Sequence, residues 1–393
     1  ADVKEVKYMG KKLLAYKRSD GSIGIRNYVL ILSTVHCANS VADKIAYKTD
    51  TVAITHEYGC LDSDAEHKST LLGLVRAAQN PNVHSVLVVG LGCEQTRPEL
   101  MIEEIRNTTG KSVEYVSIQE EGGVPEAVDK GIKIVEGFKK QADAQIREEL
   151  PLEGLIVGVQ CGGSDWTTAL SGNATIGRMS DLIVKNGGSV LMGEVYGFPG
   201  SEHIVAENAV NHEVGLSILE MVNELRQDYI KNTGQTIEEV NPTKGNKEGG
   251  ITTLVEKSIG NVKKMGNTAV QGVIKVGERI PHPGVWVLDN RHEGPDSFTT
   301  TGFAMTGAQI VAFSSGRGTP LGNAVMPVLK ITGNPNSFKS MNSLFDFNAG
   351  IVLEGETLDN AGAKLFDEII KKCNGEVTKS EINGNREYTI PHA

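Results

Sequence analysis

Short apolar runs alternate with longer amphipathic segments along the first part of the chain. The apolar runs predict strands at 27–33, 51–55, 83–90 and 113–118. Between and after them, apolar positions at helical spacing predict helices that run through 41–48, 67–79, 97–108 and 124–148. Regular alternation of strands and helices is the pattern of a parallel sheet with helical crossovers.

The second part of the chain continues this pattern with longer insertions. It predicts strands at 154–159, 188–193, 285–289, 308–313 and 327–332, and helices at 176–185 and from 202 to about 228. A polar segment at 148–151, ending in Pro151, separates the two parts. We therefore predict an α/β protein of two domains with mostly parallel sheets, a first domain at 1–150 and a larger catalytic domain at 151–393.

Composition narrows the classes of protein to consider. The 393 residues carry a formal net charge of −10, and the basic residues form no concentrated patch, which argues against binding of nucleic acid. No apolar run reaches the roughly 18 residues that a membrane span needs, so we expect a cytoplasmic protein. The five cysteines are odd in number and widely spaced, which argues against a disulfide framework.

Cysteine, histidine and carboxylate residues directly follow several predicted strands. In the clearest case, at 154–165, an apolar run ends in Cys161, two glycines, Ser164 and Asp165. Ligands of open parallel sheets bind beyond the carboxyl ends of the strands, so we expect one site at that edge. Mixed nitrogen, oxygen and sulfur donors suit iron or another divalent metal, which can polarise a carboxylate or hydroxyl. A nearby histidine could move a proton, and together these groups indicate β-elimination from a hydroxy acid.

Seven ordered motifs add a resemblance to this interpretation. They are RSDGSIGIRNYVLIL (18–32), THEYGC (55–60), VVGLGCE (88–94), VQCGGSD (159–165), GNKEGGITT (245–253), SGRGTP (315–320) and DFNAG (346–350). With these motifs the chain resembles the large catalytic portion of the altronate/galactarate dehydratase family, from about residue 14 to 392.

The resemblance implies a lyase that depends on iron (Fe2+) or manganese (Mn2+) and dehydrates a sugar acid to a 2-keto-3-deoxy acid. Long members of the family carry an additional small N-terminal domain, which in split members is a separate subunit. We therefore expect a sugar-acid substrate, a homo-oligomer, and a possible small partner subunit that supplies this domain.

The expected roles follow from the motifs and from the positions at strand ends. Arg317 stands between two glycines after a strand, which suits a bidentate clamp on the substrate carboxylate. The expected metal ligands are His56, Cys60, Cys93, Glu94 and Cys161. The expected catalytic residues are His56, Asp165, Glu194 and His203. The expected substrate-binding residues are Ser164, Asp289, Arg317, Thr319 and Asn348.

Each assignment has an alternative. His56 could cap a turn, Glu94 could favour a helix start, and Arg317 could pair with an internal acid. At the level of function, a sulfolactate sulfo-lyase would keep the fold and release sulfite in place of water. An iron–sulfur hydro-lyase would use cluster ligands at Cys37, Cys60, Cys93 and Cys161. A non-catalytic sugar-acid binding protein is the remaining possibility.

Overall fold

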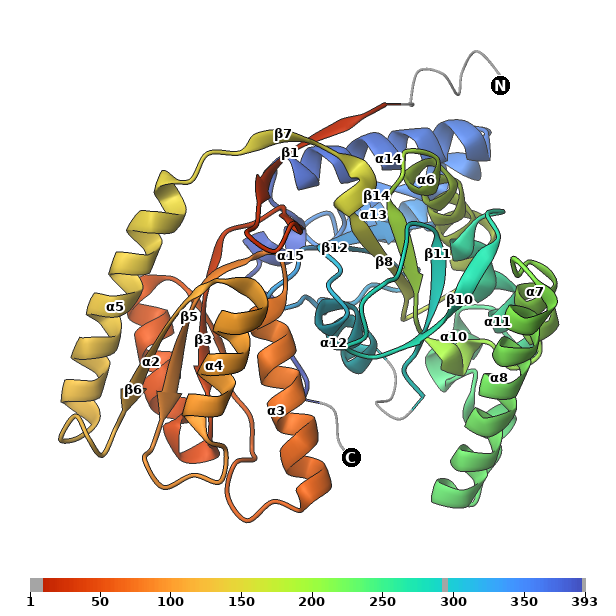
Figure 1. The fold of residues 1–393 in the computed structure, drawn as a ribbon. Coiled ribbons are helices and arrows are strands. Elements are labelled where there is room, and N and C mark those ends of the chain that lie inside the picture. The colour runs from red at the N-terminus through yellow and green to blue at the C-terminus, as the bar shows by residue number, and fades with distance from the viewer. Residues whose placement is uncertain (1–9, 292–295, 391–393) are drawn as a thin grey trace.

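The computed structural model describes residues 10–291 and 296–390, and within these ranges the strands form three sheets (Figure 1). Two of the sheets are parallel, as the alternating pattern predicts, so the α/β class with helical crossovers is confirmed. No helix in these ranges is long and apolar enough to cross a membrane.

The first parallel sheet has the strand order β4-β3-β5-β6. Helices cover both of its faces. Its strands are β3 (Tyr28–Ser33), β4 (Val52–Ile54), β5 (Val83–Gly90) and β6 (Ser112–Ser117). The helices are α2 (Asn39–Thr49), α3 (Asp64–Gln79), α4 (Pro98–Thr109) and α5 (Val124–Ala144), with the short η1 (His36–Ala38) before α2.

The second parallel sheet has the order β10-β11-β9-β8-β12-β13-β14. Its strands are β8 (Ile156–Cys161), β9 (Ser189–Met192), β10 (Val270–Lys275), β11 (Val285–Asp289), β12 (Ile310–Ser314), β13 (Val328–Thr332) and β14 (Phe347–Asn348). Its longer helices are α6 (Asn173–Lys185), α8 (His212–Thr233), α11 (Leu254–Val262), α12 (Ser297–Met305) and α14 (Leu358–Cys373). Short helices complete it: η3 (Thr168–Gly172), η4 (Val195–Gly197), α7 (Glu202–Glu207), α9 (Ile237–Val240), α10 (Lys244–Glu248), η5 (Lys263–Met265), α13 (Pro335–Ser340), η6 (Ala349–Val352) and α15 (Lys379–Ile382).

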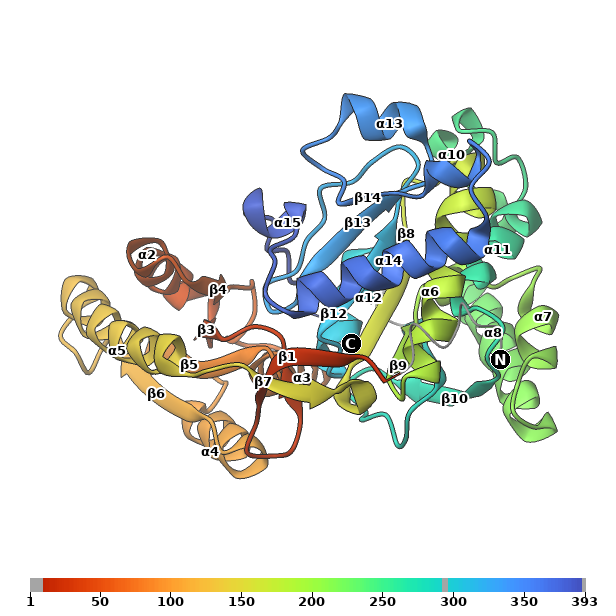
Figure 2. The same cartoon turned by 90° about the horizontal axis from the view of Figure 1, so that it is seen from above.

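The third sheet is a small antiparallel one that the apolar pattern does not predict. It has the order β2-β1-β7, from β1 (Lys12–Lys17), β2 (Ile23–Gly24) and β7 (Glu148–Pro151), with η2 (Leu152–Gly154) directly after β7. Seen from above, β1 and β7 run from the first parallel sheet across to the second (Figure 2). The helix expected at 124–148 is therefore too long, because the chain must extend to pair β7 with β1.

The helix expected from 202 to about 228 is interrupted. The chain leaves the helix at Asn208, and the Val210 backbone N–H donates to the Val270 carbonyl oxygen, 2.9 Å away. A second helix then starts at an Asn211 cap, whose side chain accepts a hydrogen bond from the Val214 N–H. Pairing with the start of β10 thus overrides the helical periodicity.

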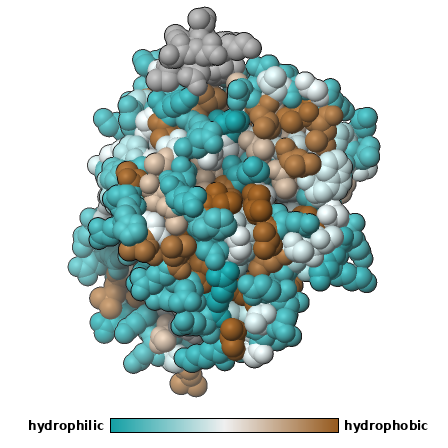
Figure 3. All heavy atoms as spheres, turned by 90° about the vertical axis from the view of Figure 1, so that its right-hand side faces the viewer, coloured by the Kyte–Doolittle hydropathy of each residue, from teal (hydrophilic) through white to brown (hydrophobic). Residues whose placement is uncertain are grey.

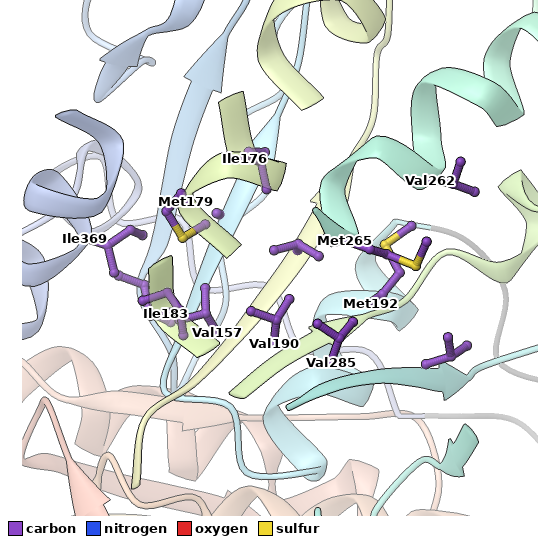
Figure 4. Packing of buried hydrophobic residues seen from close by; sticks show 14 of the residues in the cluster. Val157, Ile176, Met179, Ile183, Val190, Met192, Val262, Met265, Val285 and Ile369 are labelled. Carbon is purple, nitrogen blue, oxygen red and sulfur yellow. The ribbon is translucent and has the colours of Figure 1, made fainter. Parts of the chain in front are cut away.

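Apolar side chains of α6 pack on one face of the second sheet. Ile176, Met179 and Ile183 recur at helical spacing and are fully buried against Val157 of β8 and Val190 of β9 (Figure 4). This packing fixes the start of α6 close to the carboxyl ends of the same two strands. The other face of the sheet is covered by α12, which also contacts α3 of the first sheet.

Candidate active site

A buried group of polar side chains lies where β8 and β9 end. Lys264 of η5 is fully buried, and its Nζ donates to Glu194 Oε2 and to Cys161 Sγ, each 3.0 Å away. The Cys161 backbone N–H donates to the same Glu194 oxygen over 3.1 Å. We call Cys161, Glu194 and Lys264 the edge cluster.

Two asparagines complete the surroundings of the edge cluster. Asn261 accepts a hydrogen bond from Lys264 Nζ through its Oδ1 atom, and Asn173 donates to Cys161 Sγ over 3.5 Å. Burial and the Glu194 carboxylate both raise the pKa of the Cys161 thiol. Burial opposes the charge on Lys264, but Cys161 and Glu194 together raise its pKa above the usual value. The cluster thus joins a buried lysine, by hydrogen bonds, to a carboxylate and to a thiol.

The backbone at Glu194 explains how this side chain reaches β8. Glu194 has a φ of 62°, in the left-handed region that residues other than glycine seldom adopt. The turn comes directly after β9 and brings the carboxylate back over the end of the neighbouring strand. Such strain at a buried polar group is characteristic of functional sites.

Asp165 has hydrogen-bond partners different from those of Glu194. Its Oδ1 accepts hydrogen bonds from the backbone N–H groups of Thr167 and Thr168, 3.0 and 3.1 Å away. Its Oδ2 accepts one from the Asn334 side chain over 3.0 Å. These contacts make Asp165 the cap that begins the helical segment after β8.

His56 lies at the corresponding edge of the first sheet, and both of its ring nitrogens are engaged. Nε2 lies 2.9 Å from the Ser33 carbonyl oxygen, and Nδ1 accepts a hydrogen bond from the Tyr58 N–H over 3.1 Å. Burial lowers the pKa of His56, which favours the neutral ring that this pattern needs. In this conformation no ring nitrogen is available to a metal or a substrate.

The other expected metal ligands do not converge on one point. Glu94 accepts hydrogen bonds from the Thr34 hydroxyl and the Gly92 N–H, at 2.8 and 2.6 Å. Cys37, Cys60 and Cys93 are exposed, whereas Cys161 is buried at the second sheet. Across residues 10–291 and 296–390, no three His, Cys, Asp or Glu side chains are grouped to hold a metal ion. The expected donor set, including the four-cysteine alternative, therefore does not fit a metal or cluster within this part of the chain.

The expected substrate-binding residues also have protein partners or lie apart. Arg317 is half-exposed, and its guanidinium donates to the Gly245 carbonyl oxygen and to Glu248, at 2.9 and 3.2 Å. Asp289 pairs with Arg291, whose Nε lies 3.3 Å away. Thr319 accepts a hydrogen bond from the Leu321 N–H, and Asn348 caps η6. Ser164 is buried, and its hydroxyl has no partner among the described residues. His203 is exposed on α7.

Two family profiles match nearly all of this chain. D-galactarate/altronate dehydratase, C-terminal, matches residues 152–393, and D-galactarate dehydratase/altronate hydrolase, second domain, matches residues 15–143. The chain belongs to the D-galactarate/altronate dehydratase family. The expected enzyme class, a carbon–oxygen lyase, is confirmed at the level of this family.

Individual members of the dehydratase family match at similar identity. Altronate dehydratase of Bacillus subtilis is 33% identical over 95% of this chain and 76% of its own length. Galactarate dehydratase (L-threo-forming) of Escherichia coli is 31% identical over 92% of this chain and 72% of its own length. The (2R)-sulfolactate sulfo-lyase subunit beta of Chromohalobacter salexigens is 32% identical over 97% of both chains.

Within this dehydratase fold, sequence reasoning finds only two of the three edge-cluster residues. It identifies Cys161 and Glu194 from their places after strands, and it misses Lys264. Lys264 follows an amphipathic helix next to another lysine, Lys263, and no local pattern separates the buried lysine from an ordinary surface one. Its burial arises from η5 packing against α6, a contact between distant parts of the chain.

A surface cleft is lined by Lys263 and Met265, the two neighbours of Lys264 in the chain, and does not include the edge cluster. The cleft of about 460 Å³ opens between α6, α7 and α11, and its walls include Arg178, Ile204, Glu207, Ile259 and Met265. On the face that carries α7 and α8, apolar patches interrupt the polar surface (Figure 3). None of the expected site residues lines this cleft.

Proposed function

We propose that this chain dehydrates a sugar acid, such as altronate or galactarate, to a 2-keto-3-deoxy acid. Its family membership supports the reaction class, and the names of its relatives support the substrate class. The observation that carries the proposal is the Glu194 carboxylate, buried at the carboxyl edge of the sheet and fixed by Lys264 and by the Cys161 N–H. Ligands of parallel sheets bind at this edge.

In the proposed reaction Glu194 moves the proton. Its carboxylate takes the proton from the carbon next to the substrate carboxylate, and the hydroxyl on the following carbon accepts a proton and leaves as water. One carboxyl group can take the first proton and return it to the leaving hydroxyl, so the step needs no oxidant or reductant. The resulting enol becomes the 2-keto acid. Lys264 orients Glu194, because its Nζ is hydrogen-bonded to the carboxylate.

The test is turnover of a sugar-acid panel, with a 2-keto acid assay and sulfite detected in parallel. We expect keto acid from at least one hexonate or hexarate, and a loss of at least about 100-fold in turnover with Glu194→Gln. The exposed Glu103→Gln is the matched control and should retain wild-type turnover. If the wild type produces no keto acid from any member of the panel, either alone or with a co-expressed small chain, the proposal is wrong.

A second candidate is the release of sulfite from a sulfonated hydroxy acid. The observation in its favour is that the sulfo-lyase subunit is matched over 97% of its length, whereas the altronate dehydratase of Bacillus subtilis is matched over 76%. Sulfite released together with keto acid from sulfolactate, with no product from altronate or galactarate, would establish this candidate.

Iron or manganese dependence and a small partner subunit stay predictions. The described residues do not assemble a metal site, so a metal would need donors beyond the expected set. Treatment with a chelator and re-addition of ferrous iron or manganese tests the dependence. Turnover that needs a co-expressed small chain would establish the partner, in keeping with the word "subunit" in the name of the sulfo-lyase relative.

A further inference from the structure

One buried lysine is outside the edge cluster and is not used by the mechanism above. Lys330 lies in the middle of β13 and is fully buried, and its Nζ has no hydrogen-bond partner among the described residues. Its described contact is with the ring of Phe313, whose centroid is 4.0 Å from Nζ. A ring face compensates only part of the cost of burying an ammonium group.

The other buried lysines in the described ranges are all satisfied. Lys264 donates to Cys161 and Glu194. Lys372 donates to the Glu376 carboxylate and the Val377 carbonyl oxygen, at 2.6 and 3.0 Å. Lys111, which is partly buried, donates to two backbone carbonyl oxygens. Lys330 is therefore an exception that general packing does not explain.

Acidic side chains near Lys330 do not take the place of a partner. Asp346 accepts hydrogen bonds from the backbone N–H groups of Lys330 and Lys379, both at 2.8 Å, and it faces Lys372 at 3.8 Å. Glu387 accepts from the Gly322 N–H at 2.7 Å. Asp296 adds only a longer-range attraction. Burial outweighs the attraction of these three acids and lowers the pKa of Lys330 to about 7.

Lys330 belongs to a row of residues across the sheet. It lies beside Phe313 of β12, which in turn lies beside Gln160 of β8, on the face that α12 covers. Gln160 donates from its Nε2 to the Asp296 carbonyl oxygen over 3.0 Å, but its Oε1 is buried and has no described partner. One row thus presents an unpartnered amine and an unpartnered amide oxygen.

Both groups are close to the carboxyl edge where the edge cluster lies. Asp296 begins α12 and lies over Gly162, directly after Cys161: a Cβ atom added at Gly162 would be 2.9 Å from Asp296 Oδ1 and 3.0 Å from the Phe313 ring. The lack of a side chain at Gly162 lets the start of α12 and the Phe313 ring meet there. The row and the edge cluster thus approach the end of β8 from opposite faces of the sheet.

We propose that Lys330 binds the carboxylate of the substrate, and that the Gln160 amide oxygen accepts a hydrogen bond from a hydroxyl of the same substrate. A positive donor and an amide acceptor in one row, on either side of Phe313, fit a hydroxy acid and do not fit a simple sugar or a dicarboxylate without hydroxyls. The choice of a sugar acid rests on the proposed function. The inference gives Lys330 the role that the sequence assigns to Arg317, which is already paired with Glu248.

The test measures binding separately from turnover. The probe is meso-tartrate, a short hydroxy acid, in calorimetric titrations at pH 8 in two buffers of different ionisation enthalpy. Because the free amine is mostly neutral at this pH, pairing with a carboxylate should be accompanied by uptake of nearly one proton. We expect Lys330→Met to weaken binding at least tenfold and to abolish the uptake. Lys339→Met, which changes an exposed lysine of α13, should bind like the wild type.

Folding of the variant is checked by its thermal unfolding, which should occur at the wild-type temperature or above it because an unpartnered amine is replaced by an apolar chain. If folded Lys330→Met binds meso-tartrate like the wild type, or the wild type takes up no proton, the inference is overturned. Uptake that depends on Lys330 without any keto acid product would overturn the proposed function alone. Turnover with an unchanged KM in Lys330→Met would overturn the Lys330 role alone.

Discussion

At the scale of single residues, side chains of the same chemical type have different roles because they have different hydrogen-bond partners. Glu194 and Asp165 are both buried carboxylates that follow strands of the second sheet. Glu194 faces an ammonium group and sits in a left-handed turn, whereas Asp165 accepts backbone and side-chain N–H groups and caps a helical segment. Only the former arrangement leaves a charged pair at the strand ends.

The Glu194–Lys264 pair makes a prediction about stability. Glu194→Gln removes one charge of a pair whose side chains are 7% and 0% exposed, and it leaves Lys264 without its counter-charge. We expect the free energy of unfolding to fall by about 3 to 5 kcal/mol, as for other buried pairs that lose one partner. Adding Lys264→Met should recover part of this loss, measured by urea unfolding. Additive losses in the double variant would mean that the two residues do not interact.

His56 makes a prediction about pH. Its pKa is lowered in the folded state, so the folded protein disfavours the proton that the unfolded chain accepts near its ordinary pKa of about 6.5. The stabilisation is complete above this value and is lost as the pH falls below it. His56→Asn should therefore flatten the decline in unfolding free energy between pH 7.5 and 5.5, by up to about 1.4 kcal/mol per pH unit. Equal pH slopes for the variant and the wild type would contradict the buried neutral ring.

At the scale of elements, the lengths of buried strands can be predicted from the sequence, whereas the loops after the strands are shaped by contacts with neighbouring segments. The strands predicted at 83–90 and 285–289 are confirmed to the residue, because their apolar runs are buried on both faces. β7 is missed because its residues are largely polar and exposed, and β1 is missed because only Leu13 and Ala15 alternate as buried positions in a short segment. Pairing with each other makes both segments strands. Periodicity therefore finds elements that are buried in a sheet, and it overlooks those that only join two sheets.

The loop after β12, at Gly316, contacts the loop after β8, at Asp165, and a substitution can test this contact. A Cβ atom at this position would lie 2.0 Å from Asp165 Oδ1, so Gly316→Ala must displace the cap of the segment after β8. We expect a loss of about 2 to 3 kcal/mol in unfolding free energy, the upper range for a lost helix cap and overpacking. Gly137→Ala, in α5 with nothing within 4 Å of the added atom, should instead stabilise the protein by about 0.5 to 1 kcal/mol. Denaturant unfolding measures both, and a loss for Gly316→Ala no larger than that of an ordinary surface substitution would contradict the contact.

At the scale of the whole molecule, the two parallel sheets share one core and a set of buried amides. One apolar cluster joins Leu74 of α3 to Phe303 of α12. Asn80 donates to the carbonyl oxygens of Ala304 and Ala308, and Asn82 donates to those of Gln309 and Val325, at 2.8 to 3.0 Å. The two sheets are therefore held together by groups that neither could satisfy alone.

We expect the two sheets to unfold in one transition. The tryptophans, Trp166 and Trp286, both belong to the second part of the chain, so their fluorescence reports on that part, whereas far-UV circular dichroism reports on both. The two unfolding curves should coincide. Asn82→Ala should move both curves together, with a loss of about 3 kcal/mol from the partners it leaves unsatisfied. Separate midpoints for the two signals would mean that the parts unfold independently.

The sequence by itself determined the fold class, the succession of the main strands along the chain and the family, because these follow from local periodicity and from motifs with fixed spacing. It could not determine which residues at the strand ends meet. Cys161 and Glu194 were visible as strand-end residues, but Lys264 and Lys330 are far from them in the chain, and only packing makes these lysines buried. Burial matters because the attraction between a lysine and a carboxylate is weak in water and much stronger in a site from which water is excluded. For the same reason, His56 and Arg317 could be assigned to backbone and surface contacts only when their neighbours were in place.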